Sequence, residues 1–441
     1  MYLYSLMMFL GCLQNSRTNI LVEQLWEDNK IWFFRNPSLV QSKFEKMTID
    51  PYNFMRGTLR LHLFDIQQPA VNKPKTNFVS SPSHSQIFIV GDPHPENLAL
   101  CVSTNGQHSA EYVDFDSSDY GPWHFDLRRA AMAFRVLVEP LEGCNCAEQA
   151  IEAMVEGYIQ GVNGEGSFSG SVFDNLYREA KEEGRERKKF NKYTTRNQEG
   201  NLILADSLAE LTQQEQLLAE KIVHQFGQTK TNFRLLDTRR RFGQGISSLP
   251  AIRLVVLWDQ GEEGIHDDRL TMFRELTNPP PYTPTSFSSI PFDTNAHRIA
   301  WAATQLWERS NAINDHLGWS IDGHDFKSME YSSWTQDPDH EKIEQRWQEE
   351  TIDHFDIIEF ARDAGWTLGK TQRQSVDING KNAAKIILQD ISDNGEHVLL
   401  REMVDLSAFD HARLMSDYGL FLTLIDNQGL SLGFTSPDTT W

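Results

Sequence analysis

The sequence lacks an excess of basic residues. Its 441 residues include 41 lysines and arginines but 62 aspartates and glutamates, which gives a formal net charge of −21. A surface that neutralises nucleic-acid phosphates needs the opposite balance. We therefore expect no nucleic acid among the partners. The most basic stretch, residues 178–192, is interleaved with acids. This predicts a solvated helix face or a mobile linker, with contact to an acidic substrate or lipid as the alternative.

Cysteines are also scarce, and their spacing suits no zinc site. The four are Cys12, Cys101, Cys144 and Cys146. The C-x-C pair has no second pair and no histidine cluster at zinc-ligand spacing. A chain of this length with 39% hydrophobic residues can bury a core without disulfides. We therefore expect reduced thiols and a cytoplasmic location.

Long apolar runs are missing as well. The first 12 residues are apolar, but they are too short to span a bilayer and no lysine or arginine precedes them. We interpret them as the start of a docking helix or an overextended start site, with targeting as the alternative. The sequence predicts no membrane partner. It contains no internal repeat and no low-complexity tract.

What the sequence does contain is a dense set of carboxylates between Gly91 and Arg129. Asp92 follows the apolar run 87–90, so it should emerge at the end of a buried strand, and Asn97 follows five positions later. Residues 111–113 predict a second short strand, which ends at Asp114-Phe115-Asp116. Phosphoryl transfer needs a carboxylate to orient the acceptor hydroxyl, and oxygen ligands to hold Mg²⁺. A single D-x-x-x-x-N spacing arises by chance in so acidic a chain, but here two strands each end in aspartate.

These motifs resemble the protein-kinase-like superfamily in its aminoglycoside-phosphotransferase branch, in which a G-D-x-H-x-x-N loop precedes an I-D-F/W segment. They are closer still to the DUF2252 family, with its motifs G-D-x-H-x-x-N-F-G, N-D-F-D-E and G-P-W-x-W-D-x-K-R. The counterparts here are Gly91 to Asn97, Val113 to Ser117 and Gly121 to Arg129. An upstream S-P-F-x-F-x-R-G motif is matched by Asp50 to Gly57. The resemblance is spread over most of the chain and is strong from about residue 46 to 135.

The resemblance implies a role for each matching residue. Asp92 would be the catalytic base, and Asn97 and Asp114 the ligands of Mg²⁺. Asp126 would be a buried carboxylate that braces the catalytic loop through backbone N–H groups.

Three further residues have roles that stay open. Asp116 occupies the glycine position of a D-F-G turn, so it is either a second metal carboxylate or a solvated loop residue. His94 is a candidate for catalytic proton transfer, with a brace that hydrogen-bonds within the loop as the alternative. Arg56, in the upstream motif, is a candidate structural brace.

The expected nucleotide-binding half lies downstream. A G-x-G turn formed by Gly243 and Gly245, with Ser247 after it, precedes a strand expected at 252–257. Backbone amides of such a turn can approach phosphates, although a G-x-G pattern alone is weak. The next strand, 270–275, resembles the family's strand that ends in K-E-A and supplies a phosphate-binding lysine.

At that lysine position this sequence has Arg274. Arginine is a planar fork that does not fit every lysine site, so we expect weaker nucleotide binding or slower transfer. Glu308, on a helix expected at 295–313, is either the ion-pair partner of this cation or an ordinary solvated residue.

The order of these parts predicts the fold. In an ordinary kinase the glycine-rich lobe precedes the catalytic loop, whereas here the loop comes first, which indicates a circular permutation. An amphipathic helix at 357–368 resembles the one that precedes the catalytic loop in unpermuted relatives. We predict an α+β, two-lobed, protein-kinase-like fold. Its four parts are an N-terminal helical arm (1–45), the catalytic-loop part of the helical lobe (46–225), a nucleotide-binding sheet lobe (226–335) and C-terminal helices that complete the helical lobe (336–441).

The predicted function is ATP- and Mg²⁺-dependent transfer of a phosphoryl group to a hydroxyl, of a small molecule in preference to a protein. Two alternatives remain. One is nucleotidyl transfer, in which the nucleotide binds in the opposite orientation and AMP moves. The other is a non-catalytic, kinase-like regulator that binds nucleotide. The sequence indicates neither the acceptor nor the oligomeric state.

Overall fold

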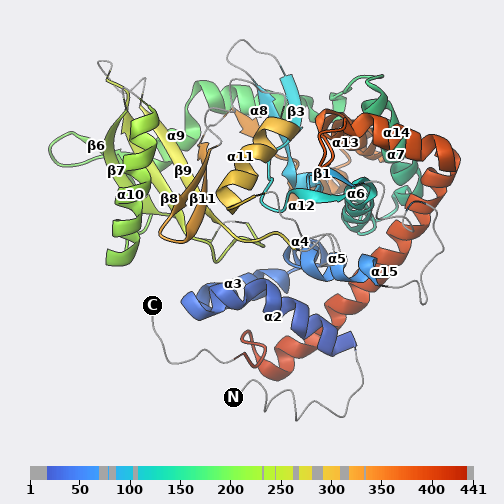
Figure 1. The fold of residues 1–441 in the computed structure, drawn as a ribbon, viewed down its shortest axis with the longest axis horizontal. Helices are drawn as coiled ribbons and strands as arrows, with labels where there is room; N and C mark the ends of the chain where they lie inside the picture. The colour runs from blue at the N-terminus through green and yellow to red at the C-terminus, as the bar shows by residue number, and fades with distance from the viewer. Residues whose placement is uncertain are drawn as a thin grey trace. The chain divides into compact units, whose positions relative to one another are not determined.

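The computed structural model combines helices with several small sheets, which confirms the predicted α+β class (Figure 1). It divides into two compact units. The first comprises residues 1–71, 245–250 and 410–441, and the second residues 72–244 and 251–409. The structure describes residues 17–68, 78, 86–102, 108–230, 233–243, 245–261, 268–280, 292–307, 317–331 and 334–434.

The first unit is helical where it is described. Proline and a capping side chain start two of its helices: Asn36 caps the helix that begins at Pro37, and Asp50 accepts a hydrogen bond from the Asn53 amide at 2.7 Å. Proline at the first helical position after a capping residue is a typical helix start. The helices are α2 (Arg17–Arg35), α3 (Pro37–Met47), α4 (Pro51–Gly57), α5 (Leu59–Gln67) and the later part of α15 (Glu396–Gln428).

The second unit contains a five-stranded antiparallel sheet with strand order β10-β11-β9-β8-β7. The strands expected at 252–257 and 270–275 are present as β8 and β9. The strands are β7 (Arg234–Arg240), β8 (Arg253–Asp259), β9 (Arg269–Leu276), β10 (Gly318–Ile321) and β11 (His324–Glu330). Helix α11 (Asn295–Leu306) connects β9 to β10 in the chain.

Both faces of this sheet are covered. Leu254, Val256 and Trp258 of β8 pack in one apolar cluster with α10 (Gln213–Thr229), which lies against the sheet in Figure 1. The alternate residues Val255 and Leu257 pack on the opposite face. There they meet residues of α9 (Lys188–Tyr193) and of the segment that contains β5 (Thr194–Arg196) and β6 (Leu202–Leu204). Successive side chains of a strand point to opposite faces, and because both faces are covered here, nearly every residue of β8 is apolar.

Two smaller sheets carry the acidic motifs. β1 (Gln86–Ile89) pairs with β4 (Asp119–Pro122). β2 (Leu98–Val102) lies between β3 (His108–Tyr112) and β12 (Thr335–Gln336). A short 3₁₀ turn, η1 (Pro95–Asn97), joins β1 to β2.

A tight helix pair packs beside these sheets. α7 (Ala147–Asn163) and α13 (His354–Gln374) meet at two pairs of glycines spaced four residues apart, Gly157 and Gly161 on one helix and Gly365 and Gly369 on the other. A Cβ atom at Gly365 would lie 2.0 Å from the Met154 carbonyl oxygen. The two backbones therefore touch, and no larger side chain fits between them.

The remaining helices of this unit complete its fold. They are α6 (Trp123–Val138), η2 (Ser171–Phe173), α8 (Asp174–Arg185), α12 (His340–Gln348), α14 (Ala383–Asn394) and the start of α15. The basic stretch 178–192 lies mostly on α8 and α9. Among the described residues, no helix is both long and apolar enough to cross a membrane.

The expectation of reduced thiols is wrong for one pair. Cys144 and Cys146 form a disulfide, with their Cα atoms 5.1 Å apart. The turn between α6 and α7, in which Asn145 adopts a positive φ of 45°, brings the two sulfurs together. Cys101 is a buried free thiol.

Candidate active site

A buried carboxylate holds the loop that follows β1. Asp126, in the first turn of α6, accepts hydrogen bonds from the backbone N–H groups of Val90 and Gly91, each at 2.8 Å. Gln372 of α13 donates a third, also at 2.8 Å. Gly91 has a φ of 97°, which only glycine adopts readily. The loop that carries Asp92 is thus fixed through its backbone.

Burial and hydrogen bonding shift the pKa of Asp126 in opposite directions. Its complete burial raises its pKa to about 6, although the bonds from Gly91, Gln372 and Val90 favour the ionised form.

Asn97 and Asp114 lie at the same end of the β2–β3 hairpin. Leu98 pairs with Tyr112, and the backbone N–H of Val113 donates to the Asn97 carbonyl at 3.1 Å. Asp114 is the next residue. The Asn97 side-chain NH₂ donates to the Asp92 carbonyl at 2.8 Å, which leaves its side-chain oxygen as the atom suited to a metal ion. One hairpin therefore brings an amide and a carboxylate together although 17 positions separate them.

Asp92 is almost buried and is paired with a buried arginine. Arg129 Nε donates to Asp92 Oδ1 at 2.7 Å, and both residues are at most 8% exposed. His94 Nε2 lies 3.9 Å from Asp92 Oδ2. These contacts hold the Asp92 carboxylate in one orientation.

Two cations from the five-stranded sheet hold the acidic turn after β3. Arg274 of β9 lies 2.6 Å from Asp114 and 2.5 Å from Asp116. Lys327 of β11 lies 3.0 Å from Asp114 and 2.6 Å from Asp116. Arg274 and Lys327 are directly opposite each other in the β9–β11 pairing, so their side chains leave the same face. Asp116 is thus ion-paired, and is not a solvated loop residue.

The charges in this cluster stabilise one another. Burial alone would raise the pKa of Asp114, but Arg274 and Lys327 outweigh it and hold that pKa well below its usual range. Burial likewise opposes the charge on Arg274, whereas Asp114 and Asp116 raise the pKa of its guanidinium. Asp114 and Arg274 are therefore charged near neutral pH.

Helix α11 also holds the acidic turn. Arg298, which is 2% exposed, donates to the Ser118 carbonyl at 2.6 Å and to the Phe115 carbonyl at 3.4 Å. The same guanidinium reaches the Thr277 carbonyl just after β9 at 3.4 Å. One buried side chain therefore joins the turn to the sheet.

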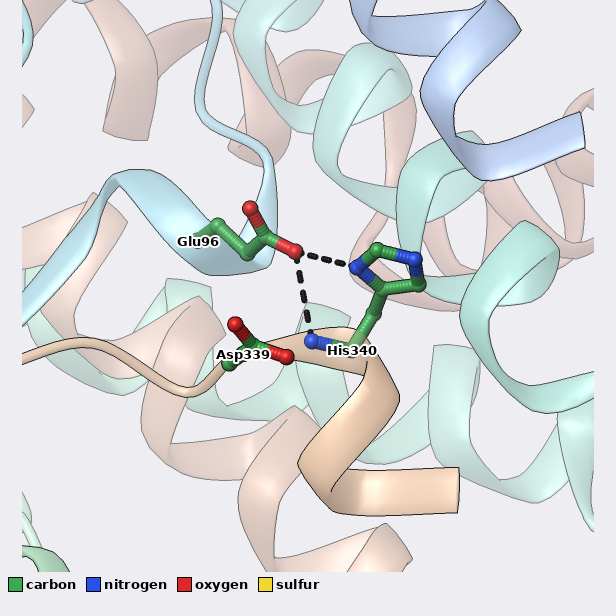
Figure 2. Close-up of side chains that lie close together, drawn as sticks. All are labelled: Glu96, Asp339 and His340. Atoms are coloured by element: carbon green, nitrogen blue, oxygen red, sulfur yellow. Dashed lines mark hydrogen bonds and ion pairs between the residues drawn. The ribbon is translucent and has the colours of Figure 1, made fainter. Parts of the chain in front are cut away.

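A second cluster joins the loop to α12 (Figure 2). Glu96 Oε1 lies 2.5 Å from His340 Nδ1 and accepts the His340 backbone N–H at 3.2 Å. Asp339 caps the same helix end through the backbone N–H groups of Glu341 and Lys342. Glu96, Asp339 and His340 each have a ligand atom within 4.8 Å of the others. Their contacts are those of a helix cap that anchors the loop.

The residues predicted for the glycine-rich turn are divided between the two units. Gly243 adopts a positive φ of 74° at the end of its described segment, and nothing lies within 4 Å of a Cβ built there. Gly245, Ser247 and Arg56 belong to the first unit, where the Ser247 hydroxyl donates to the Arg56 carbonyl. Glu308 lies outside the described residues.

Several residues at the site were not predicted from the sequence. Lys327 and Arg298 are distant from the acidic motifs in the chain. Arg129 ends the third motif, on α6, but the motif assigned it no role. One signal was available for Lys327. It stands inside a strand-like segment, between Phe326 and Met329, where lysine is unfavourable unless it has a partner.

One family model matches most of the chain. It is DUF2252, described as "Uncharacterized protein conserved in bacteria", and the match covers residues 35–423. No curated protein and no solved structure gives a significant match.

Proposed function

This chain belongs to the DUF2252 family, and from its carboxylate cluster we propose that it is an ATP- and Mg²⁺-dependent phosphotransferase that acts on a hydroxyl group. The observation that carries the proposal is the joint position of Asn97 and Asp114 at the end of one hairpin, opposite two cations of a neighbouring sheet. Oxygen ligands and cations side by side suit a magnesium-bound phosphate chain.

The residues divide the chemistry between them. Asp92 accepts the proton of the acceptor hydroxyl, and its pairing with Arg129 fixes the direction of the carboxylate. Asn97 and Asp114 would hold Mg²⁺, with Asp116 as a second carboxylate. When bound, the metal neutralises charge on the phosphates. Arg274 and Lys327 exchange their carboxylate partners for phosphate oxygens.

The sheet supports a kinase-like, circularly permuted fold. In protein kinases the phosphate-binding lysine lies on the third strand and an acidic residue of the following helix pairs with it. Arg274 lies on β9, the third strand of the sheet in chain order, and α11 follows it. One departure is plain: α11 has no acidic residue between Asn295 and Leu306, and Asp114 and Asp116 hold the cation instead.

The ion pairs also predict coupled binding. A metal ion alone must remove Asp114 and Asp116 from Arg274 and Lys327, and leaves two buried cations without partners. A phosphate that binds Arg274 and Lys327 without a metal ion leaves the two carboxylates without partners. Metal and nucleotide together give each group a new partner, so each should strengthen the binding of the other.

The test is a pair of measurements on the whole chain. Thermal stability is measured with ATP, with Mg²⁺ and with both, and transfer of the γ-phosphate is then followed into a pool of hydroxyl-containing metabolites. Asp92→Asn should bind ATP and Mg²⁺ as the wild type does but transfer phosphate roughly a thousandfold more slowly. Asp206→Asn, an exposed aspartate of the same unit, is the control. Unchanged transfer by Asp92→Asn would sink the assignment.

The two alternatives give different results in the same assay. Nucleotidyl transfer adds the mass of AMP to the product. A regulator binds nucleotide without turnover, and the ion pair between Arg129 and Asp92 favours this alternative because the guanidinium occupies one oxygen of the proposed base.

A further inference from the structure

The cations at the site form a longer row than the proposed reaction requires. Arg253 of β8 is directly opposite Arg274, which is directly opposite Lys327. Arg241 extends the row, because its backbone N–H donates to the Arg253 carbonyl at 3.0 Å. We call these four residues the cationic row: Lys327, Arg274, Arg253 and Arg241. Neighbouring strands lie about 4.8 Å apart, so the four backbone positions span roughly 14 Å.

The two ends of this row have different partners. Asp114 and Asp116 pair with Lys327 and Arg274 at one end. The same two carboxylates are the acidic groups that act on Arg253. Arg253 is 3% exposed, and its burial, with Arg274 beside it, lowers its pKa to about 9. Positive charge therefore continues beyond the acidic turn, into a part of the sheet that is closed to bulk water.

Arg241 is held in place before any ligand binds. Its guanidinium lies 5.0 Å from the ring centre of Tyr193 and 4.9 Å from that of Tyr331, and it donates a hydrogen bond to the Tyr331 hydroxyl. Within the described part of the chain, Arg241 makes no ion pair with a carboxylate. The contacts with two rings and the hydrogen bond to Tyr331 restrict the planar fork, and a guanidinium has further N–H donors besides the one that Tyr331 accepts.

We propose that Arg241 and Arg253 form a second anion subsite, which binds the phosphates of a nucleoside triphosphate that lie farther from the metal-binding carboxylates. The inference rests on the proposed function, since it extends the same site. Arg274 and Lys327 take the phosphate nearest Asp114. Arg253 and Arg241 take the next ones along the row. A buried, preorganised guanidinium binds phosphate oxygens through two parallel N–H groups, which a single lysine does not.

The probe is inorganic tripolyphosphate, compared with orthophosphate by titration calorimetry in the presence of a chelator that removes Mg²⁺. The wild type should bind tripolyphosphate more tightly, because the longer anion reaches both subsites. Arg241→Gln should weaken tripolyphosphate binding roughly tenfold and leave orthophosphate binding unchanged. Arg234→Gln, an exposed arginine at the start of β7 that pairs with Asp259, is the matched control and should change neither.

Two results overturn the subsite: equal binding of tripolyphosphate by Arg241→Gln and wild type, or equal affinity of the wild type for both anions. Arg241→Lys covers the case in which the glutamine variant does not fold. It keeps the charge but loses the fork, so tripolyphosphate affinity should fall by a smaller factor, and no fall contradicts the inference. Absence of phosphoryl transfer in the wild type would sink the proposed function alone, because calorimetry detects the subsite without turnover.

Discussion

The two sides of the candidate site are built in different ways. On the acidic side, short loops carry the functional groups, and backbone hydrogen bonds to Asp126 and within the β2–β3 hairpin fix them. On the basic side, the cations stand on regular strands, and strand register alone aligns them. The loop that carries Asp92 can therefore keep its shape without the cations, whereas the buried cations need the carboxylates as partners for their charge.

The largest effect should come from the acidic side. Asp114→Asn removes the negative charge of the proposed metal ligand and should cost about 4 kcal/mol of transition-state stabilisation, roughly a thousandfold in ATP turnover. The measurement is steady-state turnover at saturating ATP, with Asp206→Asn as the control. A loss of less than tenfold would contradict the role of Asp114 as a ligand.

The next effect separates the loop brace, Asp126, from the ion pairs that join the two sides, by their opposite dependence on pH. The pKa of Asp126 is raised to about 6, so its protonated form contributes stability below about pH 4 that is lost as the pH rises through 6. The contribution is about 3 kcal/mol. Urea unfolding should therefore show that the advantage of wild type over Asp126→Asn shrinks as the pH rises from 4 to 7.

The ion pairs that join the two sides should show the opposite trend. The pKa of Asp114 is held low, so its ion pairs contribute stability that is present above about pH 4 and is lost as the pH falls through the lowered value. The advantage of wild type over Asp114→Asn should therefore shrink on acidification. Parallel curves for the two variants would contradict the opposite pKa shifts of Asp126 and Asp114.

A smaller effect is expected for a single cation. Lys327→Met should weaken binding of ATP with Mg²⁺ roughly tenfold to a hundredfold, because Arg274 still holds the phosphate nearest Asp114. Titration calorimetry measures the change, and Lys221→Met, an exposed lysine of α10, is the control. If turnover of Lys327→Met at saturating ATP fell as far as that of Asp114→Asn, the basic side would contribute to turnover as much as the acidic side, which contradicts the difference that we describe.

The smallest effect should come from the contact between the loop and α12. His340→Ala removes the ring partner of Glu96 and should lower the free energy of unfolding by about 1 kcal/mol. Lys342→Ala, on the exposed face of the same helix, should change it less. A thermal melt of both variants tests this, and a larger loss would mean that the cluster in Figure 2 supports more than a helix end.

The acidic side could be predicted from sequence because its parts are local. Asp92, Asn97 and Asp114 fall within 23 positions, each beside a short apolar run that marks a strand. The basic side could not, because its residues are brought together by register between strands that are distant in the chain. Arg274 was found only through the family's strand motif. Lys327, 53 positions later, was missed since nothing local indicates which strand pairs with β9.

For the fold, single helices and strands could be predicted from the sequence. Apolar patterning predicted the helix at 357–368 and the strand at 252–257, and the resemblance to the family's strand predicted the one at 270–275. These elements are present as α13, β8 and β9. The four predicted segment boundaries stay a prediction, as does the permuted kinase-like arrangement. The disulfide between Cys144 and Cys146 was missed because a turn, not a spacing rule, brings these cysteines together.

The glycine contact between α7 and α13 has a consequence for the mobility of the loop that carries Asp92. Tyr158 of α7 donates a hydrogen bond to Gln372 of α13, Gln372 donates to Asp126, and Asp126 accepts from the amides of Val90 and Gly91. The chain of bonds begins where two backbones are locked together. Those two loop amides should therefore exchange with deuterated solvent as slowly as the core helices, although they border the residue proposed to meet the substrate.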